Sequence, residues 1–256
     1  MTSSPLLSLD QVTVDHPQGS EPILSSVSLH LHAGECHILM GDNGCGKSTL
    51  LHSLIGHPDY TVSAGQILWK NTDITSWPAH KRALAGIFLA FQRPVSLPGV
   101  TWLNFLKESV NARRKERKQD PLEGGEWIHY VQEALDLCHI PLKTVKRFVN
   151  DGFSGGEQKR MEMLQIAMLR PECVLLDELD SGLDIDGLRL VADLRSWCLK
   201  ENPQSLWLVV THSPDFAKQV QPHFVHVLSA KGQWNQSYAQ ASCLDTLAEH
   251  GFRGHG

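Results

Sequence analysis

Nine residues in the first fifth of the chain have the types and spacing of a phosphate-binding loop. They fit the pattern G-x-x-x-x-G-K-[ST]. Glycines let a backbone wrap closely around phosphates, and successive N–H groups then form a nest for anions. Lys47 would place its ammonium on the β- and γ-phosphates, and the Ser48 hydroxyl would bind Mg²⁺. The candidate nucleotide-contacting residues here are Gly41, Asp42, Asn43, Gly44, Cys45, Gly46, Lys47, Ser48 and Thr49.

Such a loop must be held between a strand and a helix. Residues 37–40 (His-Ile-Leu-Met) predict a short buried strand, and residues 49–55 carry leucine and isoleucine at helical spacing. Strand, glycine loop and helix in this order are the context that the motif requires. The helix N-terminus also adds partial positive charge beside the phosphates. A chance glycine turn is the alternative, and the agreement of loop and flanks argues against it.

Other polar residues follow predicted strands. The apolar run 173–176 leads into Asp177 and Glu178, the run 86–91 ends at Gln92, and a strand predicted over 206–211 is followed by His212. In open α/β sheets, ligands bind outside the carboxyl ends of strands. The alternative, a solvated strand end, fits poorly with two adjacent carboxylates after an apolar strand.

A second glycine motif, Ser154-Gly155-Gly156-Glu157, opens a second predicted helix. Its buried stripe is expected at Met161, Leu164, Ala167 and Met168, and Arg170-Pro171 would end it. Between Pro94 and about Asn150 the pattern is helical and more polar, which indicates an inserted helical subdomain. Its basic run, 113–118, is either a solvated helix face or a partner-docking face.

The remaining segments complete an α/β pattern. Apolar residues alternate with polar ones over 7–14 and 27–31, which predicts two strands of an antiparallel edge sheet. Residues 66–69 predict another strand, which would begin after a break at Ser63-Ala64-Gly65. We also predict a short helix over 78–85 with proline in its first turn, a helix over 185–199 and a strand over 224–229. His16 could stack on an adenine or could be a turn histidine.

Bulk properties narrow the class of protein. The chain has 256 residues, 41% of them hydrophobic, and a net charge of −5, which argues against nucleic acid as the main partner. No apolar run approaches the length of a membrane span, and no secretory signal opens the chain. Six scattered cysteines without a C-x-x-C pair predict reduced thiols. We therefore expect a cytoplasmic protein without direct membrane insertion.

Taken in order, these motifs resemble the ATP-binding cassette (ABC) ATPases across nearly the whole chain. The resemblance implies an α/β fold of the P-loop NTPase type. A RecA-like core with an antiparallel β subdomain would span 1–93, a helical subdomain 94–152, and the signature helix with the rest of the core 153–256. It also implies ATP and Mg²⁺ as cofactors.

Within these ATPases, four strings are similar to the SufC family of the Suf iron–sulfur cluster assembly system. They are F-L-A-F-Q-R-P-V-S-L-P-G-V at 88–100, G-F-S-G-G-E-Q-K-R at 152–160, D-S-G-L-D-I-D at 180–186 and V-H-V-L at 225–228. Asp42, Cys45 and Leu179 depart from that family's usual residues. The resemblance implies a scaffold ATPase that works with SufB-like and SufD-like partners.

The resemblance also implies a role for each matching residue. Asp177, directly or through water, and Ser48 would bind Mg²⁺. Gln92 would contact the metal ion and sense the γ-phosphate. Glu178 would be the general base, and His212 would contact the γ-phosphate and orient Glu178. Ser154, Gly155, Gly156 and Glu157 would act on an ATP held by a second copy, in a transient two-fold dimer.

Other functions remain open at this point. The runner-up is the nucleotide-binding subunit of a membrane transporter. A non-hydrolysing clamp has no need of Glu178 and His212, and a DNA-repair ATPase is disfavoured by the acidity of the chain. Val95, Leu97, Val100 and Trp102, after Gln92, either dock a partner or fill the core of the helical subdomain.

Overall fold

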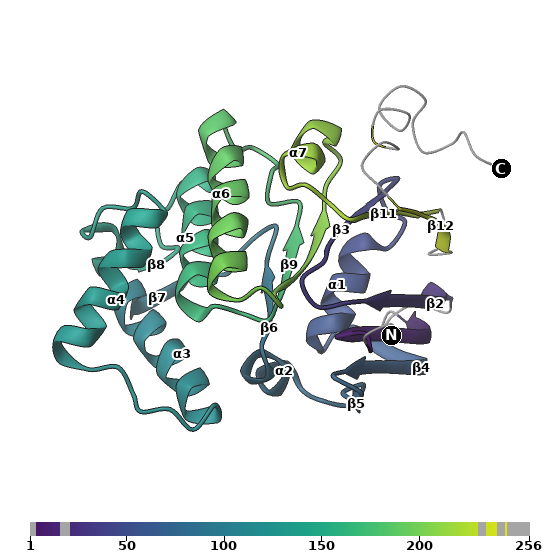
Figure 1. The fold of residues 1–256 in the computed structure, drawn as a ribbon, viewed down its shortest axis with the longest axis horizontal. Coiled ribbons are helices and arrows are strands. Elements are labelled where there is room, and N and C mark those ends of the chain that lie inside the picture. Colours follow the sequence, from purple (N-terminus) through teal and green to yellow (C-terminus); the bar gives the residue numbers. More distant parts are fainter. Residues whose placement is uncertain (1–3, 16–20, 230–233, 240–243, 245–256) are drawn as a thin grey trace.

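The computed structural model describes residues 4–15, 21–229, 234–239 and 244 (Figure 1). Its centre is a six-stranded sheet in the order β12-β11-β3-β10-β9-β6. Neighbouring strands run parallel, except that β12 pairs antiparallel with β11. The strands are β3 (Cys36–Gly41), β6 (Ile87–Ala90), β9 (Cys173–Asp177), β10 (Leu206–Val210), β11 (Phe224–Leu228) and β12 (Trp234–Ala239). His16, residues 231–232 and residues 250–256 lie outside the described residues.

Both faces of this sheet are covered, which explains its near-continuous apolar strands. Leu175 and Leu208 pack into one core with α1 (Lys47–Ile55) and the second sheet. Leu176 and Val209, one residue further along each strand, pack into another core with the helices of the opposite face. The predicted strands at 37–40, 173–176 and 206–211 are confirmed to within one or two residues.

The second sheet is antiparallel, in the order β2-β1-β4-β5. It contains β1 (Leu7–Asp15), β2 (Pro22–Leu31), β4 (Thr61–Trp69) and β5 (Thr72–Asp73). The predicted start of a strand at Gln66 is wrong, because residues 63–65 lie inside β4. Gly65 does not break the strand. It has φ +80°, and a Cβ there would lie 2.3 Å from the carbonyl oxygen of Gln11, where the register of β1 shifts.

The segment after Gln92 is mainly helical, as predicted, with α3 (Trp102–Glu116), α4 (Gly124–Leu137) and the 3₁₀ turn η1 (Thr144–Lys146). It also contains a small antiparallel pair, β7 (Leu97–Thr101) with β8 (Phe148–Val149), which the sequence did not predict. The strand β8 has only two residues, too few to show an alternating pattern. Its partner β7 contains Pro98 and Gly99, which are uncommon in strands. Trp102 is 1% exposed, so of the two alternatives for this residue the structure supports a place in the core rather than on a docking surface.

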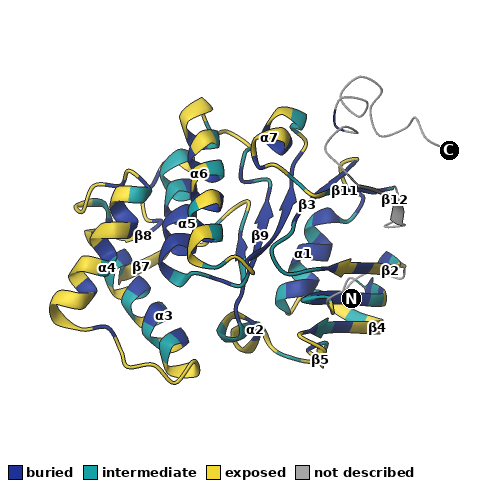
Figure 2. Cartoon of the chain, viewed as in Figure 1, coloured by how far each residue is buried: buried dark blue, intermediate teal, exposed yellow. Residues whose placement is uncertain are grey.

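The chain returns to the core through α5 (Gly155–Leu169), α6 (Ile185–Glu201) and α7 (Pro214–Gln219), while α2 (Ala79–Ala85) precedes β6. Pro78 is the N-cap of α2 and lies just before its first turn. The predicted single stripe on α5 is too narrow, because Met163 and Ile166 are as buried as Leu164 and Met168. Figure 2 shows buried positions along α5 in dark blue. The reason is that α5 lies between the sheet and the other helices. Among the described residues, no helix is long and apolar enough to cross a membrane.

Candidate nucleotide-binding site

The loop between β3 and α1 has the backbone geometry of an anion nest. Gly41 (φ 150°) and Gly46 (φ 104°) have positive φ. A Cβ on Gly41 would lie 2.3 Å from the carbonyl oxygen of Leu228, and one on Gly46 would lie 2.6 Å from Leu24 Cδ2. Gly46 caps α1 without any side-chain hydrogen bond. The first N–H groups of α1 therefore have no capping side chain, and they suit an anionic ligand.

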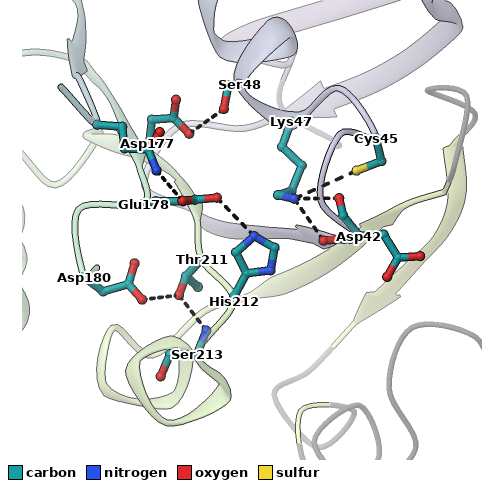
Figure 3. Close-up of polar contacts among 12 residues, drawn as sticks. Asp42, Cys45, Lys47, Ser48, Asp177, Glu178, Asp180, Thr211, His212 and Ser213 are labelled. Atoms are coloured by element: carbon teal, nitrogen blue, oxygen red, sulfur yellow. Dashed lines mark hydrogen bonds and ion pairs between the residues drawn. The ribbon is translucent and has the colours of Figure 1, made fainter. Parts of the chain in front are cut away.

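The ammonium of Lys47 lies inside this loop (Figure 3). Its Nζ donates to the carbonyl oxygens of Gly41, at 2.9 Å, and Asp42, at 3.0 Å. The Sγ of Cys45 is 4.0 Å from the same Nζ. Burial raises the pKa of the Cys45 thiol, and the charge of Lys47 opposes this only in part. The positive charge thus sits where the glycine loop would enclose phosphate.

The carboxylate of Asp177, at the end of β9, meets the beginning of α1. The hydroxyl of Ser48 donates to Asp177 Oδ1 at 3.1 Å. Asp177 is 2% exposed, and burial raises the pKa of its carboxyl, while the hydrogen bond from Ser48 lowers it. A hydroxyl and a carboxylate oxygen at this distance are the hard ligands that Mg²⁺ prefers. The residues present therefore fit a magnesium ion.

Glu178 is held on both carboxylate oxygens. The amide nitrogen of Gln92 donates to Oε2 at 2.6 Å, and Nε2 of His212 lies 3.0 Å from Oε1. Because an ionised carboxylate only accepts hydrogen bonds, Nε2 of His212 is the donor in this pair. Glu178 also has φ 48°, a left-handed conformation that is uncommon for residues other than glycine. Such strained residues cluster at functional sites, where the surrounding structure holds them.

The residues on either side of His212 are held by hydrogen bonds of Thr211, a residue to which the sequence assigned no role. Thr211, at the end of β10, donates its hydroxyl to Asp180 Oδ2 at 2.7 Å and accepts from the N–H of Ser213 at 2.9 Å. Burial raises the pKa of the Asp180 carboxyl. A polar residue ending an apolar strand was the available signal for Thr211.

The motif at the start of α5 forms a capping box. The Ser154 hydroxyl accepts from the N–H of Glu157 at 3.3 Å, and Glu157 Oε2 accepts from the N–H of Ser154 at 2.9 Å. Arg147, which the sequence analysis missed, donates to Glu157 Oε1 at 2.8 Å, and its guanidinium lies 3.9 Å from the centre of the Phe153 ring. No sequence pattern links Arg147 to this motif. Ser154 and Gly155 are exposed.

The structure thus separates the predicted site residues into two groups. The loop, Gln92, Asp177, Glu178 and His212 come together at one edge of the central sheet. Residues 154–157 make no hydrogen bond to residues 41–49 in the part of the chain that the structure describes. The first group can bind a triphosphate and take a proton from water, and the second presents an exposed helix N-terminus.

Comparison with known proteins identifies the family of the chain. The ABC transporter family profile matches residues 24–181. The chain is 44% identical over 206 residues to the probable ATP-dependent transporter SufC of Escherichia coli, covering 80% of this chain and 82% of that protein. It is 42% identical over 226 residues to a probable ATP-dependent transporter of Synechocystis, covering 88% of this chain and 87% of that protein.

A third relative is the iron-sulfur cluster assembly protein SufC of Plasmodium falciparum. It is 37% identical over 224 residues, which cover 88% of this chain and 64% of that protein. Among solved structures, the dimeric structure of a bacterial ABC transporter cassette matches with a TM-score of 0.76 at 22% identity, over 91% of this chain and 98% of that chain. At that identity the match concerns the fold alone.

Proposed function

This chain belongs to the ABC transporter family and is one of its ATPases, and we propose that it is the ATP-hydrolysing subunit of a cytoplasmic scaffold for iron–sulfur cluster assembly. The observation that carries the hydrolytic part is the Glu178 carboxylate, held between Gln92 and His212 beside the phosphate loop. The assembly role rests on the similarity to relatives that bear the name SufC.

Binding would begin at the loop. The nest of residues 41–49 takes the phosphates, and Lys47 turns from the carbonyl oxygens of Gly41 and Asp42 to the β- and γ-phosphates. Ser48, Asp177 and Gln92 would hold Mg²⁺, which when bound would supply positive charge to the same phosphates. The exchange of carbonyl contacts for phosphate contacts keeps the ammonium paired throughout.

Hydrolysis would then depend on Glu178 as general base. Its carboxylate takes a proton from the attacking water, and His212 fixes the direction of that carboxylate through Nε2. His212 also contacts the γ-phosphate. Thr211 and Asp180 keep the end of β10 in place, so that His212 stays within reach of Glu178.

The site would be completed by a second copy of the chain. Ser154, Gly155, Gly156 and Glu157 offer the N-terminus of α5 to the γ-phosphate of an ATP on the other subunit. A Cβ on Gly155 or Gly156 would have no heavy atom within 4 Å among the described residues, which leaves room for a partner's nucleotide. Two equivalent half-sites give a two-fold dimer that exists while ATP is bound.

The scaffold partners would be SufB-like and SufD-like subunits. Val95, Leu97 and Val100 are large apolar side chains that are 74%, 39% and 41% exposed, and they follow Gln92 directly in the chain. A shift of Gln92 on ATP binding would reach them through a few residues of backbone. They are our candidate docking surface.

Affinity purification of the chain from its own cells tests the partner assignment. We expect soluble scaffold subunits to co-purify, with an ATPase rate that rises on their addition. Recovery of a membrane permease in their place would assign the chain to a transporter. The nucleotide site is tested separately with Lys47→Ala, for which we expect ATP affinity to fall more than about 10-fold. Lys200→Ala, an exposed lysine on α6, is the matched control.

A further inference from the structure

A cavity of the protein is lined by residues of α3, α4 and the C-terminal end of α5. In Figure 1 these three helices lie on the side of the molecule away from α1. The volume of the cavity is about 180 Å³. Four arginines line it, Arg113, Arg114, Arg117 and Arg170, together with Gln119, Tyr130 and apolar side chains. None of the described residues that line it is acidic. We call these four arginines and Tyr130 the arginine pocket.

Two of the four guanidiniums have carboxylate partners. Arg117 Nη2 lies 3.4 Å from Glu172, and Arg170 contacts Glu201 at 2.7 Å and Glu133 at 3.4 Å. Arg113 and Arg114 differ from these two. The hydrogen bonds of Arg113 and Arg114 within the described residues go to the backbone carbonyl oxygens of Leu169 and Asp120. Within the described residues, Arg113 and Arg114 therefore form no ion pair with a carboxylate, and the pocket carries positive charge that is only partly balanced.

Arg113 is the most informative of the four because it is only 7% exposed. In the described part of the chain, its Nε and Nη2 have no hydrogen-bond partner. Burial lowers the pKa of this guanidinium to about 10. Glu172 is the acid near it, and Glu172 already pairs with Lys70 at 2.5 Å. A buried, unbalanced guanidinium is costly unless an anion meets it.

The simplest alternative is that these side chains only cap α5. Arg113 Nη1 and the Tyr130 hydroxyl do donate to the carbonyl oxygens of Leu169 and Met168 at the end of that helix. Capping of α5 uses one N–H of the Arg113 guanidinium, which has five N–H donors. It explains neither the cavity nor the presence of Arg114 and Arg117 around it.

We propose that the arginine pocket binds a small phosphate-type oxyanion, either free phosphate or the terminal phosphate of an ester. Guanidinium groups match the tetrahedral oxygens of phosphate through paired N–H donors. The volume of about 180 Å³ admits such a group but lies below the roughly 300–1,000 Å³ of sites for larger ligands. This site is separate from the loop at 41–49, and its occupancy does not depend on ATP hydrolysis.

The test is a titration of the full chain with inorganic phosphate, followed by NMR through the arginine Nε–H resonances. The nucleotide site is first filled with a non-hydrolysable ATP analogue, and Arg113→Lys assigns the Arg113 signal by its loss. We expect a saturable shift of that signal. Arg114→Ala should weaken phosphate binding about 10-fold or more, since one charge-assisted contact is lost. Lys115→Ala removes the same charge from an exposed neighbour outside the pocket and should leave the affinity unchanged.

A parallel titration with glycerol 3-phosphate distinguishes the sources. If glycerol 3-phosphate binds more tightly than inorganic phosphate, the ligand is a phosphate ester. If it binds equally or more weakly, the ligand is free phosphate. The proposal is overturned if the shift never saturates, if chloride at equal ionic strength reproduces it, or if Arg114→Ala and Lys115→Ala behave alike while thermal melts show both to be folded. The arginines would then serve only the end of α5.

Discussion

Gln92 donates a hydrogen bond of 2.6 Å to Oε2 of Glu178, although 86 positions separate the two residues. The predicted sensor of the γ-phosphate is thus bonded directly to the predicted base. In the proposed mechanism Gln92 would turn to the metal and the phosphate, and Glu178 would lose one of its two hydrogen-bond partners and keep the other, His212. That mechanism would couple the binding of nucleotide to the orientation of the base.

Glu178→Gln should keep ATP binding and lower hydrolysis by about 10²-fold or more, because an amide cannot accept the proton from water. The variant should also accumulate as an ATP-bound dimer, since the ligand that joins the subunits is no longer consumed. Single-turnover hydrolysis and size-exclusion chromatography with Mg-ATP measure the two effects. Asp186→Asn, the corresponding change of a carboxylate to an amide at an exposed residue of α6, is the control. Wild-type turnover in Glu178→Gln would remove Glu178 from the mechanism.

Ser154→Arg should leave ATP binding by each monomer nearly unchanged and block hydrolysis, because bulk and charge at the start of α5 obstruct the second subunit. Mixing it with Lys47→Ala gives dimers with one doubly defective site and one intact composite site. We expect partial activity at most from that mixture. Full recovery of the wild-type rate would show that residues 154–157 do not act across the interface.

Glu162, a 4% exposed carboxyl on α5, should make stability depend on pH. Burial raises its pKa to about 8, above the ordinary 4.5, with smaller opposing effects from Gln165 and the Phe91 backbone. The folded state then binds more protons than the unfolded state between these values, so stability is lost as the pH rises through this window. One such group gives a slope of up to about 1.4 kcal/mol per pH unit.

Urea unfolding of wild type and Glu162→Gln between pH 5 and pH 8 measures this slope. We expect the stability of Glu162→Gln, relative to wild type, to increase with pH. Glu116→Gln, at an exposed position of α3, should run parallel to wild type. Parallel curves for all three proteins would show that Glu162 titrates normally.

Val100→Asp should weaken binding to SufB-like and SufD-like partners while the isolated subunit stays folded and binds ATP, because Val100 is 41% exposed. Partner stimulation of hydrolysis and the effect of ATP on partners should be lost together. Trp102→Ala should behave differently and cost about 3–5 kcal/mol of stability, since Trp102 is a buried core residue. Binding assays beside thermal melts separate the two effects.

Ile128→Asp changes another exposed apolar residue, on α4, and is the control for that comparison. If Val100→Asp and Ile128→Asp bind partners equally well, the docking surface lies elsewhere. The exposed members of the basic run at 113–118 are then the next candidates. Arg113 is not among them, because it is buried against α5.

Local pattern in the sequence was enough to predict the phosphate loop, the strands that deliver Asp177, Glu178 and His212, and the alternation of strands and helices. Each of these depends on neighbours within about ten residues. Glycines at fixed spacing, an apolar run before two carboxylates, and a helical repeat after the loop all act through the backbone next to them. The start of β4 was predicted wrongly because it does not depend on neighbouring residues: the conformation of Gly65 is set by its contact with Gln11 on another strand.

Only the tertiary structure decided which of these residues meet. The order β3-β10-β9-β6 places His212, Glu178 and Gln92 at the ends of successive strands, and no local pattern encodes that order. The same is true of burial. The sequence left the place of Trp102 open, and Arg113 and Glu162 are charged residues that usually lie at the surface, but all three are buried in the packed structure. Burial depends on contacts between segments far apart in the chain, so charge and hydropathy alone could not reveal it.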